Sequence, residues 1–153
     1  TLDEDKLLEA ATMALCWSRA WAGGGAHGTV YSVKPAQVSK TANTGEFVGK
    51  GAFIVRGQRK WFKDLDVQIG IGIVAINGVP LLMGATPSTI KNICKRYAIL
   101  APGLTKKEQL ANKIYKNTGL ITDDILGILP GAGEILEDYG IFSPPKEIEQ
   151  EEE

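Results

Sequence analysis

Apolar residues recur at helical intervals near the start of the chain and predict a first helix that ends before three consecutive glycines. Thr1 and Glu4 have the spacing of a capping box, which would satisfy backbone N–H groups of the first turn. We expect Leu8, Ala11 and Leu15 to face the core, because the apolar stripe is too wide to be left in water.

The middle of the chain alternates apolar residues with polar or small ones, which predicts strands. Asn77-Gly78 favours a type I′ hairpin turn, because both central residues need positive φ. Pro80 cannot donate a ladder hydrogen bond, so its strand should lie at an edge of the sheet. The predicted strands cover residues 29–33, 52–55, 67–76, 79–83 and 98–101.

Three further helices are predicted from capping residues and apolar periodicity. The first has Thr86 as its N-cap and Pro87 at its first helical position. The other two begin at the caps Thr105 and Thr122, and Gly119 ends the former. The apolar stripe of the helix after Thr86 comprises Ile90, Ile93, Cys94 and Tyr97.

These elements together predict an α+β fold, with an antiparallel sheet and its hairpins packed against a few helices. A length of 153 residues with 44% hydrophobic content suits one compact domain, which we expect over residues 1–145. Residues 146–153 should form an acidic disordered tail, since they bury too little apolar surface to offset the loss of entropy. Because Thr1 starts on a helix cap without an initiator Met, we expect a piece of a longer protein.

Charge is distributed unevenly along the chain, although its net value is only −1. From Lys34 to Lys63 there are seven basic residues against the single acid Glu46, in a segment rich in Ser, Thr and Gly. We expect a long loop here, and its length suggests a function. The acids gather instead at the end of the chain: Glu134, Glu137, Asp138, Glu147, Glu149, Glu151, Glu152 and Glu153.

The two cysteines, Cys16 and Cys94, lie in apolar helical patterns without a partner at metal-ligand spacing, which predicts two buried reduced thiols. No apolar run reaches the roughly 18 residues that a membrane span needs. We therefore expect a cytoplasmic protein without a metal site.

Two glycine patterns resemble nucleotide-binding motifs. The segment Gly45 to Gly51 is one residue short of a P-loop and ends in glycine where magnesium needs Ser or Thr. Gly70, Gly72 and Ala75 fit a dinucleotide fingerprint, but the pattern continues as a strand instead of turning into a helix. No nucleotide cofactor is expected at either place.

Catalytic groups are equally sparse. His27 is the sole histidine and lies in a glycine-rich segment without a marked nucleophile, which favours a solvated loop side chain. Asp123 and Asp124 fall in the first turn of a predicted helix, where carboxylates interact favourably with the exposed N–H groups. We expect that this chain is not an enzyme and binds no cofactor.

Basic and aromatic residues are interleaved after the strand 52–55. Lys and Arg neutralise phosphates, and an exposed ring such as that of Trp61 can stack on a base. Ser39 and Thr41 would add hydrogen bonds. The alternative is a protein-interaction scaffold that buries its aromatics and turns its basic loop toward an acidic partner. The candidate RNA-binding residues are Lys34, Ser39, Lys40, Thr41, Lys50, Arg56, Arg59, Lys60, Trp61 and Lys63.

A likeness to a known family covers this same region. The order and spacing of residues over roughly 8–63 resemble the later part of the RNA-binding domain of the NFACT family, and the stretch 80–133 looks more loosely like its archaeal members. The segments that carry the likeness are Ala10–Trp21, Gln37–Thr41, Thr44–Glu46 and Gly51–Gly57.

The resemblance implies a role in ribosome-associated quality control. Members of the family bind the large ribosomal subunit carrying stalled peptidyl-tRNA, and archaeal homologues are often labelled fibronectin-binding proteins. The implied partners are tRNA, ribosomal RNA and the remaining domains of the full-length protein. The family's domain begins further upstream, so this chain would hold only its later part.

Overall fold

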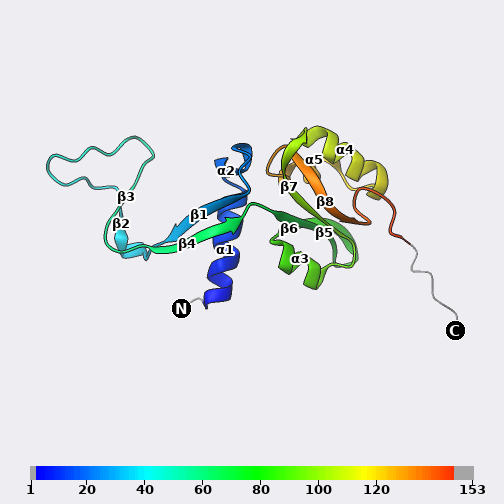
Figure 1. The fold of residues 1–153 in the computed structure, drawn as a ribbon, viewed down its shortest axis with the longest axis horizontal. Coiled ribbons are helices and arrows are strands. Elements are labelled where there is room, and N and C mark those ends of the chain that lie inside the picture. Colours follow the sequence, from blue (N-terminus) through cyan, green and yellow to red (C-terminus); the bar gives the residue numbers. More distant parts are fainter. Residues whose placement is uncertain (1–2, 147–153) are drawn as a thin grey trace.

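The computed structural model describes residues 3–146. Figure 1 shows an elongated molecule with a thin projection at one end and a helix-covered sheet at the other. We call residues 27–66 the arm and residues 67–146 the body. Helix α1 (Glu4–Cys16) packs against the base of the arm, and the short helix α2 (Arg19–Ala22) follows it. No helix in the described range is long and apolar enough to cross a membrane.

The arm consists of two successive pairs of antiparallel strands. Strand β1 (His27–Ser32) pairs with β4 (Lys60–Asp66) at its base. Further out, a 3-10 turn η1 (Pro35–Gln37) leads into β2 (Val38–Ser39), which pairs with β3 (Ile54–Val55). The loop between β2 and β3 forms the tip of the arm (Figure 1).

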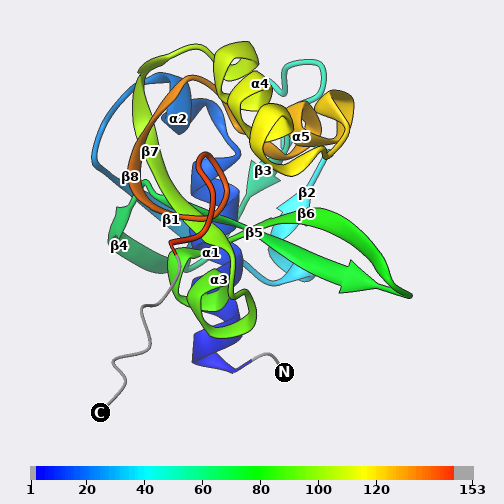
Figure 2. The ribbon, with the colours of Figure 1, turned by 90° about the vertical axis from the view of Figure 1, so that its right-hand side faces the viewer.

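The body is a four-stranded antiparallel sheet in the order β6-β5-β7-β8. Figures 1 and 2 show α4 and α5 on one face of the sheet and α3 on the other. The elements are β5 (Ile69–Ile76), β6 (Val79–Ala85), α3 (Pro87–Ile93), β7 (Tyr97–Thr105), α4 (Lys107–Thr118), α5 (Thr122–Ile128) and β8 (Gly133–Tyr139). Mixed helices and antiparallel strands confirm the predicted α+β class.

The two faces of β5 serve two apolar cores. Ile69 and Ile71 point into the main core with residues of α1, α4 and α5. Gly70 and Gly72 lie on the other face, where a Cβ would come within 2.6 Å of Ile90 and 2.5 Å of the Cys94 sulfur. Glycine therefore lets α3 approach the strand closely, which gives the fingerprint-like pattern a packing explanation.

Local turn chemistry was predicted correctly at several points. Asn77 and Gly78 have φ of 50° and 78°, as the hairpin turn between β5 and β6 requires. The Thr86 hydroxyl accepts a hydrogen bond from the Thr89 N–H and caps α3. Gly119 ends α4 with φ 74°, and Pro80 lies on the edge strand β6.

The first helix differs from its prediction in three respects. It is capped by Asp3, whose carboxylate accepts from the Lys6 N–H, while Thr1 lies outside the described residues. It ends at Cys16, because Ser18 caps the separate helix α2. Ala11 and Leu15 are buried as expected, but Leu8 is 45% exposed.

Other predictions for the body were wrong in detail. Lys106 and Ile121 hold the cap positions of α4 and α5, so Thr105 and Thr122 lie one residue away from their predicted places. Ile93 is 54% exposed, whereas its neighbours Ile90 and Cys94 are buried. Strand β8, the second edge strand, was not predicted.

Both cysteines are free and buried, as predicted. Burial raises the pKa of the Cys16 thiol to about 11, against the opposing effect of its hydrogen bond to the Gln68 carbonyl. Of the acidic tail expected at 146–153, only Lys146 belongs to the described range.

Candidate nucleic-acid interface

No residue between 27 and 66 is buried, although Val30 and Leu65 at the base of the arm pack against the main core. Polar contacts link the two sides of the outer part of the arm. Gln37 joins its two sides: the side-chain amide donates to the carbonyl oxygens of Arg56 at 2.9 Å and Gln58 at 2.7 Å. Gly57, between these two carbonyls, has φ of 82°, a conformation that favours glycine. The chain therefore turns sharply from β3 into the segment that leads to β4.

An ion pair closes the loop at the tip. The Arg56 guanidinium donates to both carboxylate oxygens of Glu46, at 2.7 and 3.2 Å. The Asn43 N–H donates to the same carboxylate at 3.1 Å. The hydrogen bond from Arg56, aided by that from Asn43, lowers the pKa of Glu46 below its ordinary value. Phe47, next to this pair, is left 93% exposed.

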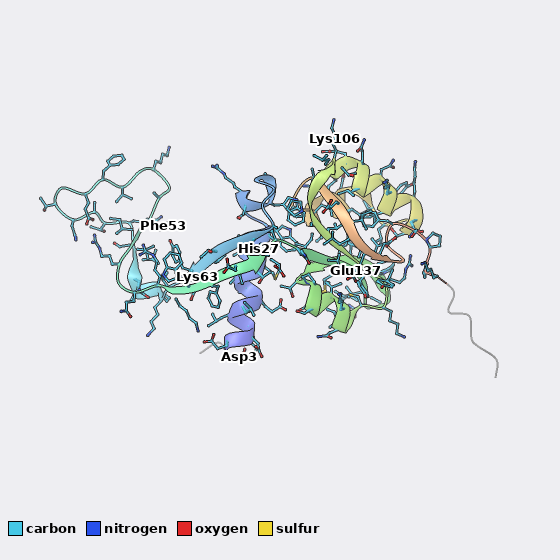
Figure 3. All side chains as sticks on the ribbon, viewed as in Figure 1. Asp3, His27, Phe53, Lys63, Lys106 and Glu137 are labelled. Atoms are coloured by element: carbon cyan, nitrogen blue, oxygen red, sulfur yellow. The ribbon has the colours of Figure 1, made fainter. Side chains whose placement is uncertain are left out.

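All ten predicted RNA-binding residues lie on the arm. Lys34 precedes η1, Ser39 ends β2, and Lys60, Trp61 and Lys63 belong to β4. Figure 3 shows Phe53 and Lys63 on the arm, apart from Glu137 of the body. The remaining predicted residues, Lys40, Thr41, Lys50, Arg56 and Arg59, flank these strands or lie in the loop.

Three cations of this set lie against aromatic rings. Lys40 Nζ is 5.2 Å from the centre of the Phe53 ring, and the Arg59 guanidinium carbon is 5.0 Å from that of Tyr31. Lys60 Nζ is 5.7 Å from the Phe62 ring. The predicted interleaving of charge and aromatic surface therefore exists in three dimensions. Lys40 and Arg59 thus hold positive charge beside rings that are themselves partly exposed.

The cations differ in what else they contact. Arg56 is paired with Glu46, and Lys60 is paired with Glu4 of α1. The other cations of the candidate set have no carboxylate within ion-pair distance among residues 3–146: Lys34, Lys40, Lys50, Arg59 and Lys63. The Ser39 hydroxyl accepts from the Thr41 N–H at 3.0 Å, so these two residues stabilise each other's turn. The free charge of the arm is thus concentrated on a subset of the predicted residues.

Sequence reasoning missed the aromatic residues that complete this surface. Tyr31 is 41% exposed and Phe53 is 57% exposed, and both lie beside cations of the candidate set. Tyr31 of β1 lies opposite Trp61 of β4, although the two residues are some thirty positions apart in the sequence. The residues themselves are visible in the sequence, but their register is not.

The single histidine of the chain lies at the base of the arm. His27 belongs to β1 and not to a loop, and its Nδ1 lies 3.0 Å from a carboxylate oxygen of Asp66 on the paired strand. Both side chains are exposed. Within the described part of the chain, no group of three or more His, Cys, Asp and Glu residues is arranged to hold a metal ion.

Comparison with known proteins identifies the family. Residues 1–57 match the NFACT protein RNA binding domain. The archaeal Rqc2 homolog aRqcH of Methanocaldococcus jannaschii is 33% identical over 135 residues, which make up 86% of this chain and 20% of that protein. The chain belongs to the NFACT family.

Animal relatives share a shorter stretch. The ribosome quality control complex subunit NEMF of Homo sapiens is 38% identical over 68 residues, and the NEMF homolog of Drosophila melanogaster is 37% identical over the same length. These stretches cover 44% of this NFACT chain but only 6% and 7% of the relatives. The chain thus spans a fifth or less of the proteins it resembles. No solved structure matches it.

Proposed function

We propose that this chain is an RNA-binding module of a cytoplasmic ribosome quality control factor and that the arm is its RNA-contacting surface. Large-subunit ribosomal RNA and tRNA are the proposed partners. Binding, and not catalysis, is the proposed activity. The relatives named for ribosome quality control support the cellular role, and the matched RNA-binding domain supports the ligand class.

The observation that carries the proposal is that exposed cations of the arm lack carboxylate partners. Lys50 and Lys63 are exposed and have no carboxylate partner in residues 3–146, so no ion pair must be broken before they meet a phosphate. Counterion release on meeting phosphate is the main source of sequence-independent affinity for nucleic acids. A scaffold that buried its aromatics would instead cover Trp61, which is 53% exposed.

The test removes two of these charges. The double variant Lys50→Gln, Lys63→Gln of the whole chain is titrated with tRNA and with large ribosomal subunits at several salt concentrations. Affinity should fall, and the slope of log K against log salt should flatten by about 0.7 to 0.9 per lost phosphate contact. The melting temperature should stay at the parent value, because both side chains are exposed.

The matched control removes the same charge from the body. Lys113→Gln, Lys116→Gln changes two exposed lysines of α4 and should leave the salt slope close to that of the parent. Equal losses in both double variants would show that binding follows net charge and not the arm. No measurable affinity of the parent for either RNA would refute the proposed function itself.

A further inference from the structure

The three tryptophans of the chain occupy different surroundings. Trp17 donates its indole N–H to the Ile128 carbonyl at 2.8 Å, and Trp21 donates to the Ala132 carbonyl at 2.7 Å. These two side chains tie α1 and α2 to the body. The indole N–H of Trp61 has no acceptor within residues 3–146, and its side chain is 53% exposed. Trp61 therefore does not take part in a comparable structural contact.

Trp61 belongs to a cluster of three side chains on one face of the arm. Tyr31 is its direct partner in the β1–β4 register, and the ring centres are 5.2 Å apart with an interplanar angle of 65°. Arg59 lies over the Tyr31 ring at 5.0 Å. Arg59 lies one residue before β4, and the Tyr31 ring lies beside both its guanidinium and the Trp61 ring, so cation, phenol and indole meet at one place.

Arg59 brings an uncompensated charge to this cluster. Its neighbours Arg56 and Lys60 are neutralised by Glu46 and Glu4. Arg59 itself donates only a long hydrogen bond, 3.4 Å, to the Val55 carbonyl, and no acid of the described range pairs with it. The Arg59 guanidinium, which lies over the Tyr31 ring, therefore places a positive charge beside the exposed rings of Tyr31 and Trp61.

We propose that Arg59, Tyr31 and Trp61 form a stacking site for an unpaired nucleobase, a proposal that rests on the RNA-binding function above. A base has a π-face that an exposed indole can cover, whichever base it is. In an RNA helix both faces of a base are covered by neighbouring bases, and the deep groove is too narrow for side chains. The arm should therefore prefer single-stranded segments, with Arg59 beside the adjoining phosphate.

A cross-strand aromatic pair also stabilises a sheet, so the test must separate stacking on RNA from support of the arm. The body offers a matched control. Tyr97 and Tyr139 face each other across β7 and β8 with ring centres 4.9 Å apart, and Tyr139 is 54% exposed. Tyr139→Leu removes one exposed ring of such a pair without touching the arm.

The experiment compares two RNA probes of equal phosphate number, one single-stranded and one duplex, on the whole chain. Trp61→Leu should weaken binding of the single strand by roughly five- to 150-fold, with the duplex affinity and the salt slope unchanged. Trp61→Phe should retain most of the affinity, and Tyr139→Leu all of it. Single-stranded RNA should quench tryptophan fluorescence in the parent but not in Trp61→Phe.

The outcomes distinguish this site from the proposed function. If Trp61→Leu binds both probes as the parent does, while Lys50→Gln, Lys63→Gln flattens the salt slope, the arm binds phosphates and the base site is refuted. Equal losses on the two probes also refute it. Should Trp61→Leu unfold, absence of Trp61-dependent fluorescence quenching in the parent overturns the proposal on its own.

Discussion

Tyr97 and Tyr139 in the body form the same kind of cross-strand pair as Tyr31 and Trp61 in the arm, at similar centroid distances. The surroundings differ. Strands of the body lie between α3 on one face and α4 and α5 on the other, whereas the arm has only α1 near its base (Figure 1). Stability should therefore reside in the body, while the arm is free to present side chains.

The largest effect is expected in the main core. Leu15 of α1 is 5% exposed and packs into that core, so Leu15→Ala should lower the free energy of unfolding by about 2 to 5 kcal/mol. Leu8→Ala makes the same substitution two turns earlier on the same helix, at a side chain that is 45% exposed. Chemical denaturation of both variants should show a clearly smaller loss of unfolding free energy for Leu8→Ala than for Leu15→Ala. Equal losses would contradict the burial described above.

An intermediate effect is expected where α1 meets the body. The Glu9 carboxylate accepts hydrogen bonds from the Thr86 hydroxyl, at 2.6 Å, and from that of Thr89. Because Thr86 is buried, Glu9→Ala should cost about 1 to 3 kcal/mol in unfolding free energy. Glu9→Gln keeps an acceptor oxygen and should cost less. Hydrogen exchange of the α3 amides would show whether the loss is local to this contact.

In the arm, removal of a negative charge should alter RNA binding without altering the free energy of unfolding. Glu46→Gln removes the carboxylate that pairs with Arg56 and frees that guanidinium for phosphate. RNA affinity should rise, and the salt slope should steepen by at most about one phosphate contact. Glu4→Gln should act in the same direction through Lys60. A weaker affinity in Glu46→Gln would mean that the closed loop itself is needed for binding.

The smallest effect concerns pH. The folded pKa of Glu46 lies below its ordinary value of 4.5, so its pair with Arg56 is intact above that value and is lost as the pH falls through the lowered pKa. NMR spectra should show the amides of residues 43–47 shifting only below pH 4.5. The melting temperature should not follow this titration, since the pair is exposed. Shifts in the same amides at neutral pH would disagree with the lowered pKa.

Local features of the body were readable from the sequence because each depends on a few adjacent residues. Asn77-Gly78 makes its turn by its own φ preferences, and Thr86-Pro87 begins its helix by the same short-range chemistry. Features that depend on distant contacts were not readable. Helix α1 ends at Cys16, and the next residue, Trp17, donates its indole N–H to the carbonyl of Ile128, more than a hundred residues away. Strand β8 was missed because its charged residues conceal its alternation.

The candidate site shows the same division between features that depend on adjacent residues and features that depend on distant contacts. Its basic residues and Trp61 stand close together in the sequence, so their shared location on the arm follows from proximity. The pairing of Tyr31 with Trp61 depends on a register that is shifted by an irregularity between Gly28 and Val30. Asp64, with φ of 55°, lies on the opposite strand within the same irregularity. Such backbone details depend on the folded context, and alternation alone does not determine them.

The edges of the body sheet bear on the solubility of the folded chain. An exposed strand edge is a template on which another chain can add a strand and begin an aggregate. Pro80 on β6 offers no N–H to such a strand. At the end of β8, the Asp138 carboxylate accepts from the N–H groups of Ile141 and Phe142 and turns the chain away from the sheet direction. Pro80 therefore disfavours addition of a strand along β6, and the turn after Tyr139 ends the edge that β8 exposes.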